Sequence, residues 1–163
     1  MGMTRKVTLV EVGPRDGFQN VKETIATEDK IAIIRGMMES GVRQMEITSF
    51  VNPKWLPQMA DADSVARTIL SEAPEDFRAI ALAPNARGVQ NAVESGLKNV
   101  TYVLSASESH NRKNVNRPIE RSLEELSDIC QTYKDTSIRV SLAVSFGCPF
   151  EGQVPVSQVL RVV

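Results

Sequence analysis

Apolar runs typical of β-strands alternate with amphipathic helical stretches along this 163-residue chain. Five runs are predicted as strands: residues 7–12, 44–48, 78–83, 100–105 and 138–145. A helical pattern follows each of them, and the last one covers residues 156–163. Such an alternation favours parallel strands in one sheet with helices packed on it. We therefore expect a parallel α/β fold.

Several residues mark the expected ends of these helices. Thr27 is predicted to be an N-cap because acidic residues follow it, and Asn85 is predicted to cap a later helix. The sequence Glu-Ser-Gly occurs at residues 39–41 and again at 94–96, each time between a helix and a strand. No low-complexity linker interrupts the chain, so residues 1–163 are expected to form a single domain.

Composition argues against several functional classes. The net charge of −1 provides no basic surface for nucleic acid. No run approaches the roughly 18 apolar residues of a membrane span, so no membrane partner is expected. The two cysteines, Cys130 and Cys148, lack the spacing of a metal site, and a reducing cytoplasm is the expected location.

A cation and a carboxylate, Arg15 and Asp16, directly follow the first predicted strand. Glycine and proline on either side force a turn, so the pair is expected at a strand end. In parallel α/β proteins, ligands bind at the carboxyl ends of strands. An Asp16 carboxylate suits Mg²⁺ or Mn²⁺, which prefer oxygen ligands, although a plain turn carboxylate is the alternative.

Four stretches of the chain resemble hydroxymethylglutaryl-CoA lyases. The run Glu11-Val-Gly-Pro-Arg-Asp-Gly-Phe-Gln-Asn20 is similar to the signature at the start of these enzymes. Three later stretches follow in the family's order: Glu46-Ile-Thr-Ser-Phe-Val-Asn-Pro-Lys-Trp-Leu-Pro-Gln-Met-Ala-Asp61, Ala83-Pro-Asn85 and Phe146-Gly-Cys-Pro-Phe-Glu-Gly152. The family consists of divalent-metal TIM barrels related to isopropylmalate synthase and to the carboxyltransferase domain of pyruvate carboxylase.

The resemblance implies a (β/α)₈ TIM barrel, of which this chain would hold about the first five βα units. A complete barrel needs roughly 200–250 residues, so the expected domain is the N-terminal part of a barrel, truncated within its fifth helix. The family's His-x-His pair and asparagine, which complete its metal site, are expected outside these residues. Open strand edges favour association, and a homo-oligomer is expected.

The resemblance also implies roles for the residues around the first two strands. Arg15 would stabilise an enolate on the substrate's thioester oxygen, because a guanidinium stays charged and offers paired donors. An Arg15–Asp16 ion pair is the alternative. Glu46 would support catalysis near the metal, with structural pairing to Arg15 as its alternative. Independently of the resemblance, Glu11 is expected inside the first strand; if it points into the barrel it must be paired, because an unpaired buried charge is costly, and Arg15 is the candidate partner.

Three further polar residues are candidates for binding substrate. Gln19 and Ser49 follow the first two predicted strands, with ordinary loop positions as the alternative. Asn114 lies in a basic, polar stretch, residues 110–117, which is predicted to be a loop. The resemblance implies that this loop approaches the acyl-CoA. The alternative is a solvated loop without a binding role.

The expected activity is cleavage of 3-hydroxy-3-methylglutaryl-CoA to acetyl-CoA and acetoacetate, with Mg²⁺ or Mn²⁺ as cofactor. A related acyl-CoA lyase or a Claisen-condensing enzyme is the first alternative. The run Val12-Gly-Pro-Arg-Asp-Gly17 favours the lyases, because the synthases usually carry Thr-Leu-Arg-Asp-Gly. A catalytically incompetent fragment that works by association is the second alternative, and this chain alone is expected to be inactive.

Overall fold

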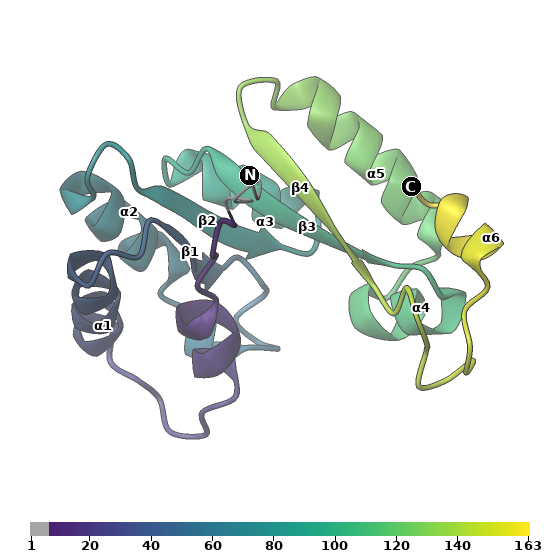
Figure 1. The fold of residues 1–163 in the computed structure, drawn as a ribbon, viewed down its shortest axis with the longest axis horizontal. Coiled ribbons are helices and arrows are strands. Elements are labelled where there is room, and N and C mark those ends of the chain that lie inside the picture. Colours follow the sequence, from purple (N-terminus) through teal and green to yellow (C-terminus); the bar gives the residue numbers. More distant parts are fainter. Residues whose placement is uncertain (1–6) are drawn as a thin grey trace, which may run out of the picture.

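A four-stranded parallel sheet forms the centre of the computed structural model, which describes residues 7–163 (Figure 1). The strands lie side by side in chain order: β1 (Gln44–Ser49), β2 (Arg78–Ala83), β3 (Asn99–Ser105) and β4 (Ser137–Ala143). The longer helices are α1 (Thr27–Glu39), α2 (Ala62–Glu72), α3 (Ala86–Glu94) and α5 (Ile119–Thr132). Because a helix joins each strand to the next parallel one, the fold is the expected α/β type.

Four shorter helical elements complete the described chain: η1 (Gly13–Gly17), η2 (Pro57–Met59), α4 (Glu108–Val115) and α6 (Val156–Leu160). The prediction of a loop at residues 110–117 is wrong, because most of that stretch belongs to α4. Ser107 caps α4 by accepting a hydrogen bond from the His110 backbone N–H at 3.3 Å. The stretch is polar on all sides, so hydrophobic periodicity gave no sign of this helix.

The first predicted strand, residues 7–12, is reduced to one isolated bridge between Glu11 and Met45. Glu11 N donates to Gln44 O at 2.9 Å, and Glu46 N donates to Glu11 O at 2.8 Å. Val7 and Leu9 are 79% and 83% exposed. Among the described residues this segment has a strand neighbour on one side only, so little of its backbone is paired and its apolar side chains stay uncovered.

The helix starts differ in how well the sequence predicted them. Asn85 caps α3 as expected, since its Oδ1 accepts from the Gly88 N–H at 2.9 Å. The prediction for α1 is wrong by one residue, because Ala26 is its N-cap and Thr27 is already helical. The Thr27 hydroxyl instead donates to Asp61 Oδ2 at 2.9 Å, so it ties α1 to the start of α2.

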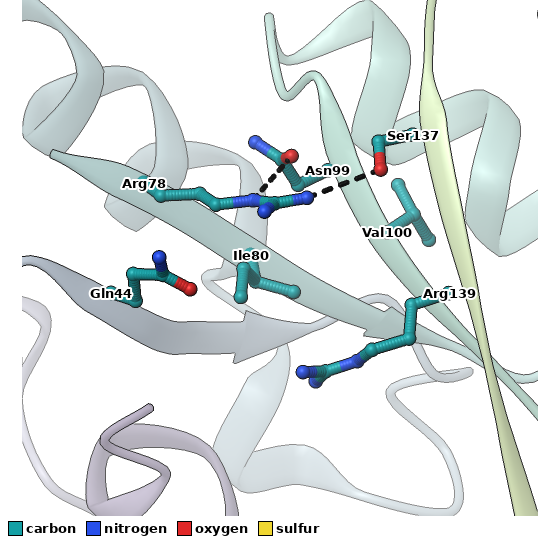
Figure 2. A pocket seen from close by; sticks show the side chains of 7 residues that line it. All are labelled: Gln44, Arg78, Ile80, Asn99, Val100, Ser137 and Arg139. Atoms are coloured by element: carbon teal, nitrogen blue, oxygen red, sulfur yellow. Dashed lines mark hydrogen bonds between the residues drawn. The ribbon is translucent and has the colours of Figure 1, made fainter. Parts of the chain in front are cut away.

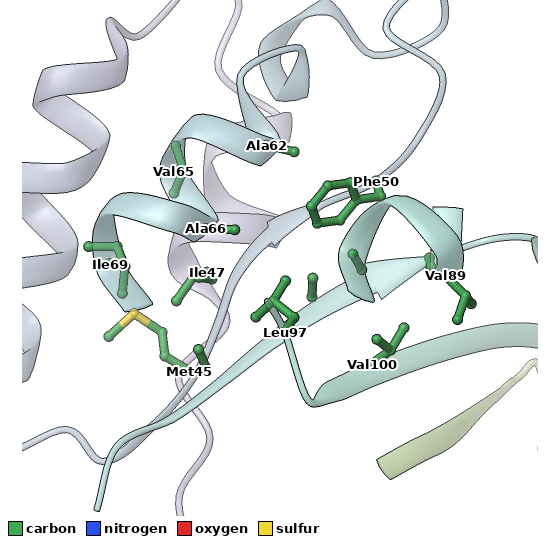
Figure 3. Packing of buried hydrophobic residues seen from close by; sticks show 14 of the residues in the cluster. Met45, Ile47, Phe50, Ala62, Val65, Ala66, Ile69, Val89, Leu97 and Val100 are labelled. Atoms are coloured by element: carbon green, nitrogen blue, oxygen red, sulfur yellow. The ribbon is translucent and has the colours of Figure 1, made fainter. Parts of the chain in front are cut away.

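One face of the sheet is buried against helices, with α2 packing on β1, α3 on β2 and α5 on β3. Figure 3 shows part of this core around Met45, Ile47 and Val65. Side chains at alternating strand positions, such as Met45, Ile47 and Val100, point into this core. Gly88 lets α3 approach closely, because a Cβ there would lie 2.6 Å from the Phe50 carbonyl oxygen. Within the described chain, no helix is both long and apolar enough to cross a bilayer.

The short Glu-Ser-Gly repeat has a conformational basis. Gly41 and Gly96, which follow α1 and α3, have φ angles of +101° and +94°. Both N–H groups bond back to helix carbonyls, at Met38 and Val93. Glycine adopts these left-handed angles without strain, so it ends both helices and redirects the chain toward the next strand.

Candidate functional site

The η1 turn displays Arg15 and Asp16 immediately after the Glu11 bridge. Backbone N–H groups of Arg15 and Asp16 both reach Val12 O, at 3.1 and 2.7 Å, which fixes the turn. Asp16 Oδ1 accepts from Arg15 Nη1 at 2.7 Å and from Gln19 Nε2 at 2.6 Å. The turn therefore brings together three of the predicted site residues.

Glu46 connects this turn to the sheet. Its Oε2 accepts from Arg15 Nε at 2.8 Å and pairs with Arg15 Nη2 at 2.7 Å. Its Oε1 accepts from Thr101 Oγ1 at 2.9 Å and from Arg139 Nη2 at 2.5 Å. Glu46 lies in the middle of β1 rather than at its end, and its side chain is only 3% exposed. Each of its carboxylate oxygens therefore has two donors.

Arg15, Asp16, Glu46, Thr101 and Arg139 form the Glu46 cluster, in which the charges balance. Two cations, Arg15 and Arg139, face two carboxylates, Glu46 and Asp16. The Asp16 and Arg139 side chains are 52% and 49% exposed, so one carboxylate and one cation of the cluster are in contact with solvent. Charged hydrogen bonds of this kind are short and directional, which holds the Arg15 guanidinium in one orientation.

The prediction that Arg15 pairs with Glu11 is wrong. Glu11 Oε1 accepts from the Gly13 backbone N–H at 2.6 Å, so it stabilises the start of the turn. Arg15 reaches the more deeply buried carboxylate of Glu46 instead. This pairing confirms the alternative given for Glu46, structural pairing to Arg15, between residues that lie 31 positions apart in the sequence.

The other two predicted substrate contacts, Ser49 and Asn114, make no hydrogen bond with Arg15, Asp16 or Glu46 in the described structure. Ser49 is the last residue of β1 and is 1% exposed, and its Oγ has no hydrogen-bond partner among the described residues. A buried hydroxyl without a partner is costly, so it is a candidate donor to a bound group. Asn114 is exposed on α4 and makes no hydrogen bond with Arg15, Asp16 or Glu46.

The described residues do not by themselves make a metal centre. No three or more His, Cys, Asp or Glu side chains in the range 7–163 come together to hold an ion. Asp16 offers a carboxylate oxygen, whereas Mg²⁺ needs a nearly octahedral set of oxygens. Asp16 therefore fits one position of such a site, and the other positions need other donors.

Thr101 and Arg139 are the site residues that sequence reasoning missed. β1, β3 and β4 each begin with a polar, an apolar and a second polar residue, and Glu46, Thr101 and Arg139 stand third. The two-residue period of a strand puts third positions on one face, and the register pairs Thr101 with Arg139. Comparing strand starts in this way would have revealed the cluster.

A cavity of about 60 Å³ lies at the amino-terminal ends of the strands (Figure 2). The first residue of every strand lines it, as does Arg139, the one member it shares with the Glu46 cluster. Arg78 spans it by donating to Asn99 Oδ1 at 2.7 Å and to Ser137 Oγ at 3.2 Å. This volume holds a few waters and is too small for an acyl-CoA.

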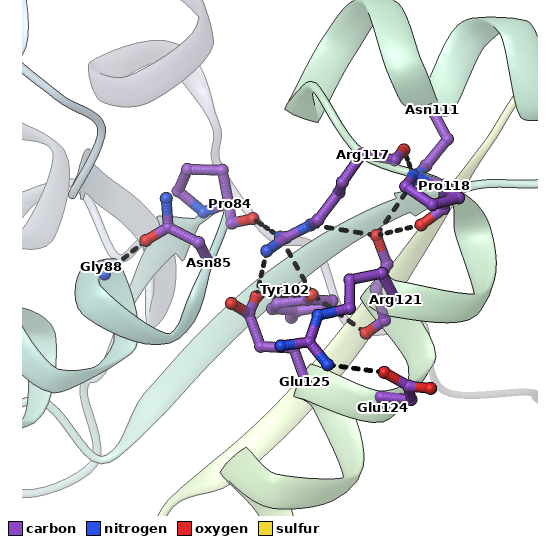
Figure 4. Close-up of polar contacts among 11 residues, drawn as sticks. Pro84, Asn85, Gly88, Tyr102, Asn111, Arg117, Pro118, Arg121, Glu124 and Glu125 are labelled. Atoms are coloured by element: carbon purple, nitrogen blue, oxygen red, sulfur yellow. Dashed lines mark hydrogen bonds and ion pairs between the residues drawn. The ribbon is translucent and has the colours of Figure 1, made fainter.

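A second polar network lies on the helix-covered face of the sheet (Figure 4). Arg117 pairs with Glu125 Oε1 at 2.6 Å and donates to Tyr102 Oη at 3.1 Å and to Pro84 O at 2.5 Å. Burial raises the pKa of the Tyr102 phenol well above its usual value, so it stays neutral. Tyr102 alternates with Thr101 along β3, so this network supports α5 from the face opposite Glu46.

Comparison with known proteins gives a consistent family relationship. A family model described as HMGL-like matches residues 6–163. A hydroxymethylglutaryl-CoA lyase of Bacillus subtilis is 45% identical over 99% of this chain and 54% of its own length. A cytoplasmic 3-hydroxy-3-methylglutaryl-CoA lyase of Danio rerio is 45% identical over 96% of this chain and 47% of its own length. The chain thus spans about half the length of these curated relatives.

Solved structures give the same result. The crystal structure of the Bacillus subtilis HMG-CoA lyase superposes with a TM-score of 0.90 at 45% identity, covering 96% of this chain and 53% of that protein. An HMG-CoA lyase of Acinetobacter baumannii, solved with coenzyme A and 3-methylmalate, also gives 0.90, at 33% identity and with 96% and 51% covered. The four-stranded sheet is therefore an incomplete barrel that corresponds to about half of these chains.

Proposed function

Because this chain belongs to the HMGL-like family, we propose that it supplies the first half of the active site of a hydroxymethylglutaryl-CoA lyase. The observation that carries the proposal is the buried pairing of Arg15 with Glu46, directly beside the exposed Asp16 carboxylate. A held guanidinium next to a solvent-facing carboxylate suits a reaction in which negative charge develops on a substrate oxygen.

In the proposed reaction, a base takes the proton of the C3 hydroxyl and the C2–C3 bond breaks. C3 becomes the keto carbon of acetoacetate, while the bond's electron pair moves into a thioester enolate that is later protonated at C2. An arginine carries five N–H donors, of which Arg15 uses three on Glu46 and Asp16, leaving two. We assign these two to the thioester oxygen.

Asp16 is proposed as one oxygen ligand of a divalent cation, Mg²⁺ or Mn²⁺, whose other ligands lie outside the described residues. When bound, such a cation polarises substrate oxygens. Gln19 orients the Asp16 carboxylate through its 2.6 Å hydrogen bond. Gln19 and Ser49 are the proposed hydrogen-bonding groups for the acyl end of the substrate.

Asn114 and the basic residues of α4 are the proposed contacts of the coenzyme A portion. The Acinetobacter baumannii relative, solved with coenzyme A, supports an acyl-CoA as the substrate class. The free thiols of Cys130 and Cys148 support a reducing compartment, and the cytoplasm is the location we propose.

A chimera tests the proposal directly. These 163 residues would replace the matching segment of the Bacillus subtilis lyase, to which they are 45% identical. We expect the chimera to cleave hydroxymethylglutaryl-CoA with Mg²⁺ or Mn²⁺, as measured by release of acetoacetate. The remaining half of the Bacillus protein, purified alone, is the control. A folded chimera without cleavage above that control would refute the proposal.

A further inference from the structure

We propose that Arg139 is a positioning residue that acts on Arg15 through the Glu46 carboxylate. Arg139 is 93 positions from Glu46 in the sequence and belongs to none of the four stretches that carry the family resemblance. The expected effect of Arg139 on the reaction rate rests on the proposed function. The expected effect on the orientation of Arg15 does not, because it concerns contacts within this chain.

The contacts form one continuous path across three strands. Arg139 Nη2 donates to Glu46 Oε1 at 2.5 Å and to Thr101 Oγ1 at 2.9 Å, and Thr101 Oγ1 donates to the same Oε1 at 2.9 Å. This closed triangle fixes Oε1. The opposite oxygen, Oε2, takes Arg15 Nε and Nη2. The guanidinium of Arg139 therefore reaches that of Arg15 through a single carboxylate.

The role of Arg139 follows from the freedom of a carboxylate. The last torsion of a glutamate is broad, so bonds at one oxygen alone do not hold its plane. With Oε1 held by Arg139 and Thr101, Oε2 points at Arg15 in one direction. Without Arg139, Oε1 keeps only the neutral Thr101 hydroxyl, and that hydroxyl loses its own Arg139 donor, so Glu46 is held less firmly and Arg15 gains freedom to shift toward the exposed Asp16. A displacement of about 1 Å is enough to slow a positioned reaction by about 10²-fold.

The same contacts also determine the role of Glu46 itself. Both of its oxygens are occupied by two donors each, and three of those four bonds come from guanidinium groups. A carboxylate surrounded in this way has no free position from which to accept or pass a proton. Glu46 therefore acts as an anion that orients Arg15, rather than as the acid or base of the reaction.

Kinetics in the chimera test this with matched variants. We expect Arg139→Gln to lower kcat about tenfold or more while KM changes less than about threefold, because orientation matters most in the transition state. Arg139→Lys should recover much of the loss by restoring the cation. Arg78→Gln is the control, since Arg78 lines the same cavity but bonds Asn99 and Ser137 instead of Glu46 (Figure 2).

Coupling separates positioning from a general structural effect. In a Glu46→Gln background, Arg139→Gln should change kcat less than about twofold, because the two residues act as one unit. An undiminished effect in that background would overturn the proposal, as would Arg139→Gln with near-parent kcat or Arg78→Gln with an equal loss.

A second measurement needs no catalysis. In the ¹⁵N-arginine-labelled chimera, the Arg15 Nε–H that donates to Glu46 should give an NMR signal that exchanges slowly with solvent. Loss of this signal in Arg15→Lys assigns it. Arg78→Gln should keep this signal and Arg139→Gln should lose its protection. If the chimera fails to cleave substrate, the proposed function fails while this signal still decides the positioning role. An Arg15 signal unchanged in Arg139→Gln would refute it.

Discussion

Glu46 is the residue on which the candidate site depends. It is the only group in the described cluster that contacts η1, β3 and β4 together, through Arg15, Thr101 and Arg139. A buried carboxylate is tolerated only when it is paired, so the four bonds of Glu46 are needed for the folded state to be stable. The same bonds orient the Arg15 guanidinium. Arg15 is different, because its removal leaves Glu46 with Arg139 and Thr101.

Replacing Arg15 tests that difference. We expect Arg15→Ala in the chimera to lower the rate of cleavage by about 10²–10³ or more, because a charged donor to the enolate oxygen is lost. The fold should persist, as judged by circular dichroism, and Mn²⁺ binding by isothermal titration should stay near that of the parent. A variant with near-parent turnover would remove Arg15 from the mechanism.

The two cysteines give a second residue-scale prediction. Cys130 is exposed and Cys148 is buried with its Sγ 3.0 Å from Ser107 Oγ. Burial alone would raise the pKa of the Cys148 thiol, but hydrogen bonds from Ser107 and from the Phe150 and Glu151 backbone lower it overall. Because access limits a buried thiol, a disulfide reagent should label Cys130 first and Cys148 slowly.

The measurement is the time course of thiol labelling in native and denatured protein. Two phases are expected in the native protein, and Cys130→Ser should remove the fast one. Unfolded protein should release both thiols in one phase. A fast native phase that survives Cys130→Ser would show that Cys148 is accessible.

At the scale of elements, polar contacts join neighbouring helices over the apolar core. Asp63 of α2 accepts from Ser95 Oγ, just after α3, at 2.6 Å and from Arg67 Nε at 2.8 Å. The Ser95 hydrogen bond, followed by Arg67, holds the pKa of Asp63 below its usual value, while burial opposes the shift. This contact joins α2 to the end of α3.

The sign of this shift predicts a pH dependence. A carboxylate with a lowered folded-state pKa contributes stability above its unfolded pKa of about 3.9, and the contribution is lost as pH falls through the lower, folded value. Asp63→Asn should therefore destabilise the protein at pH 7, and the difference should shrink below about pH 4. Urea unfolding at both pH values measures this, with Glu120→Gln at an exposed position of α5 as control. A difference independent of pH would contradict it.

At the scale of the whole molecule, both edges of the described sheet have exposed apolar side chains nearby. β4 pairs with β3 alone, and its Val140 is 43% exposed. Val156 and Leu160 of α6 are 73% and 69% exposed, and Leu9 lies uncovered at the other edge. Unpaired strand edges and exposed apolar side chains favour pairing with another polypeptide.

We therefore expect the 163-residue chain alone to associate, to bind divalent metal weakly and to lack lyase activity. Asp16 is the one proposed metal ligand, and no three metal-type side chains come together among the described residues, so water would fill most of the coordination shell. Light scattering gives the mass in solution, Mn²⁺ titration the affinity, and acetoacetate release the turnover, with the chimera as positive control. Robust turnover by an 18.0 kDa monomer would contradict this account.

Local patterns predicted the elements well where a strand is buried on a helix-covered face. The strand predicted at residues 78–83 matches β2 at both ends, and Asn85 caps α3 as expected. Prediction failed for the segment at residues 7–12, where apolar alternation is present but only one bridge forms. Prediction also failed for α4, because this helix is stabilised by the Ser107 cap and has no apolar face that the sequence pattern could show.

The sequence by itself determined the α/β class, the order of the elements and the turn that carries Arg15 and Asp16, because these depend on periodicity and on residues close together in the chain. Only the tertiary structure decided the partners of Arg15. Strand register places Thr101 opposite Arg139, and the sheet brings both to Glu46. Such contacts depend on how distant strands align, and a buried carboxylate binds the cations that the fold places within reach, which no local pattern specifies.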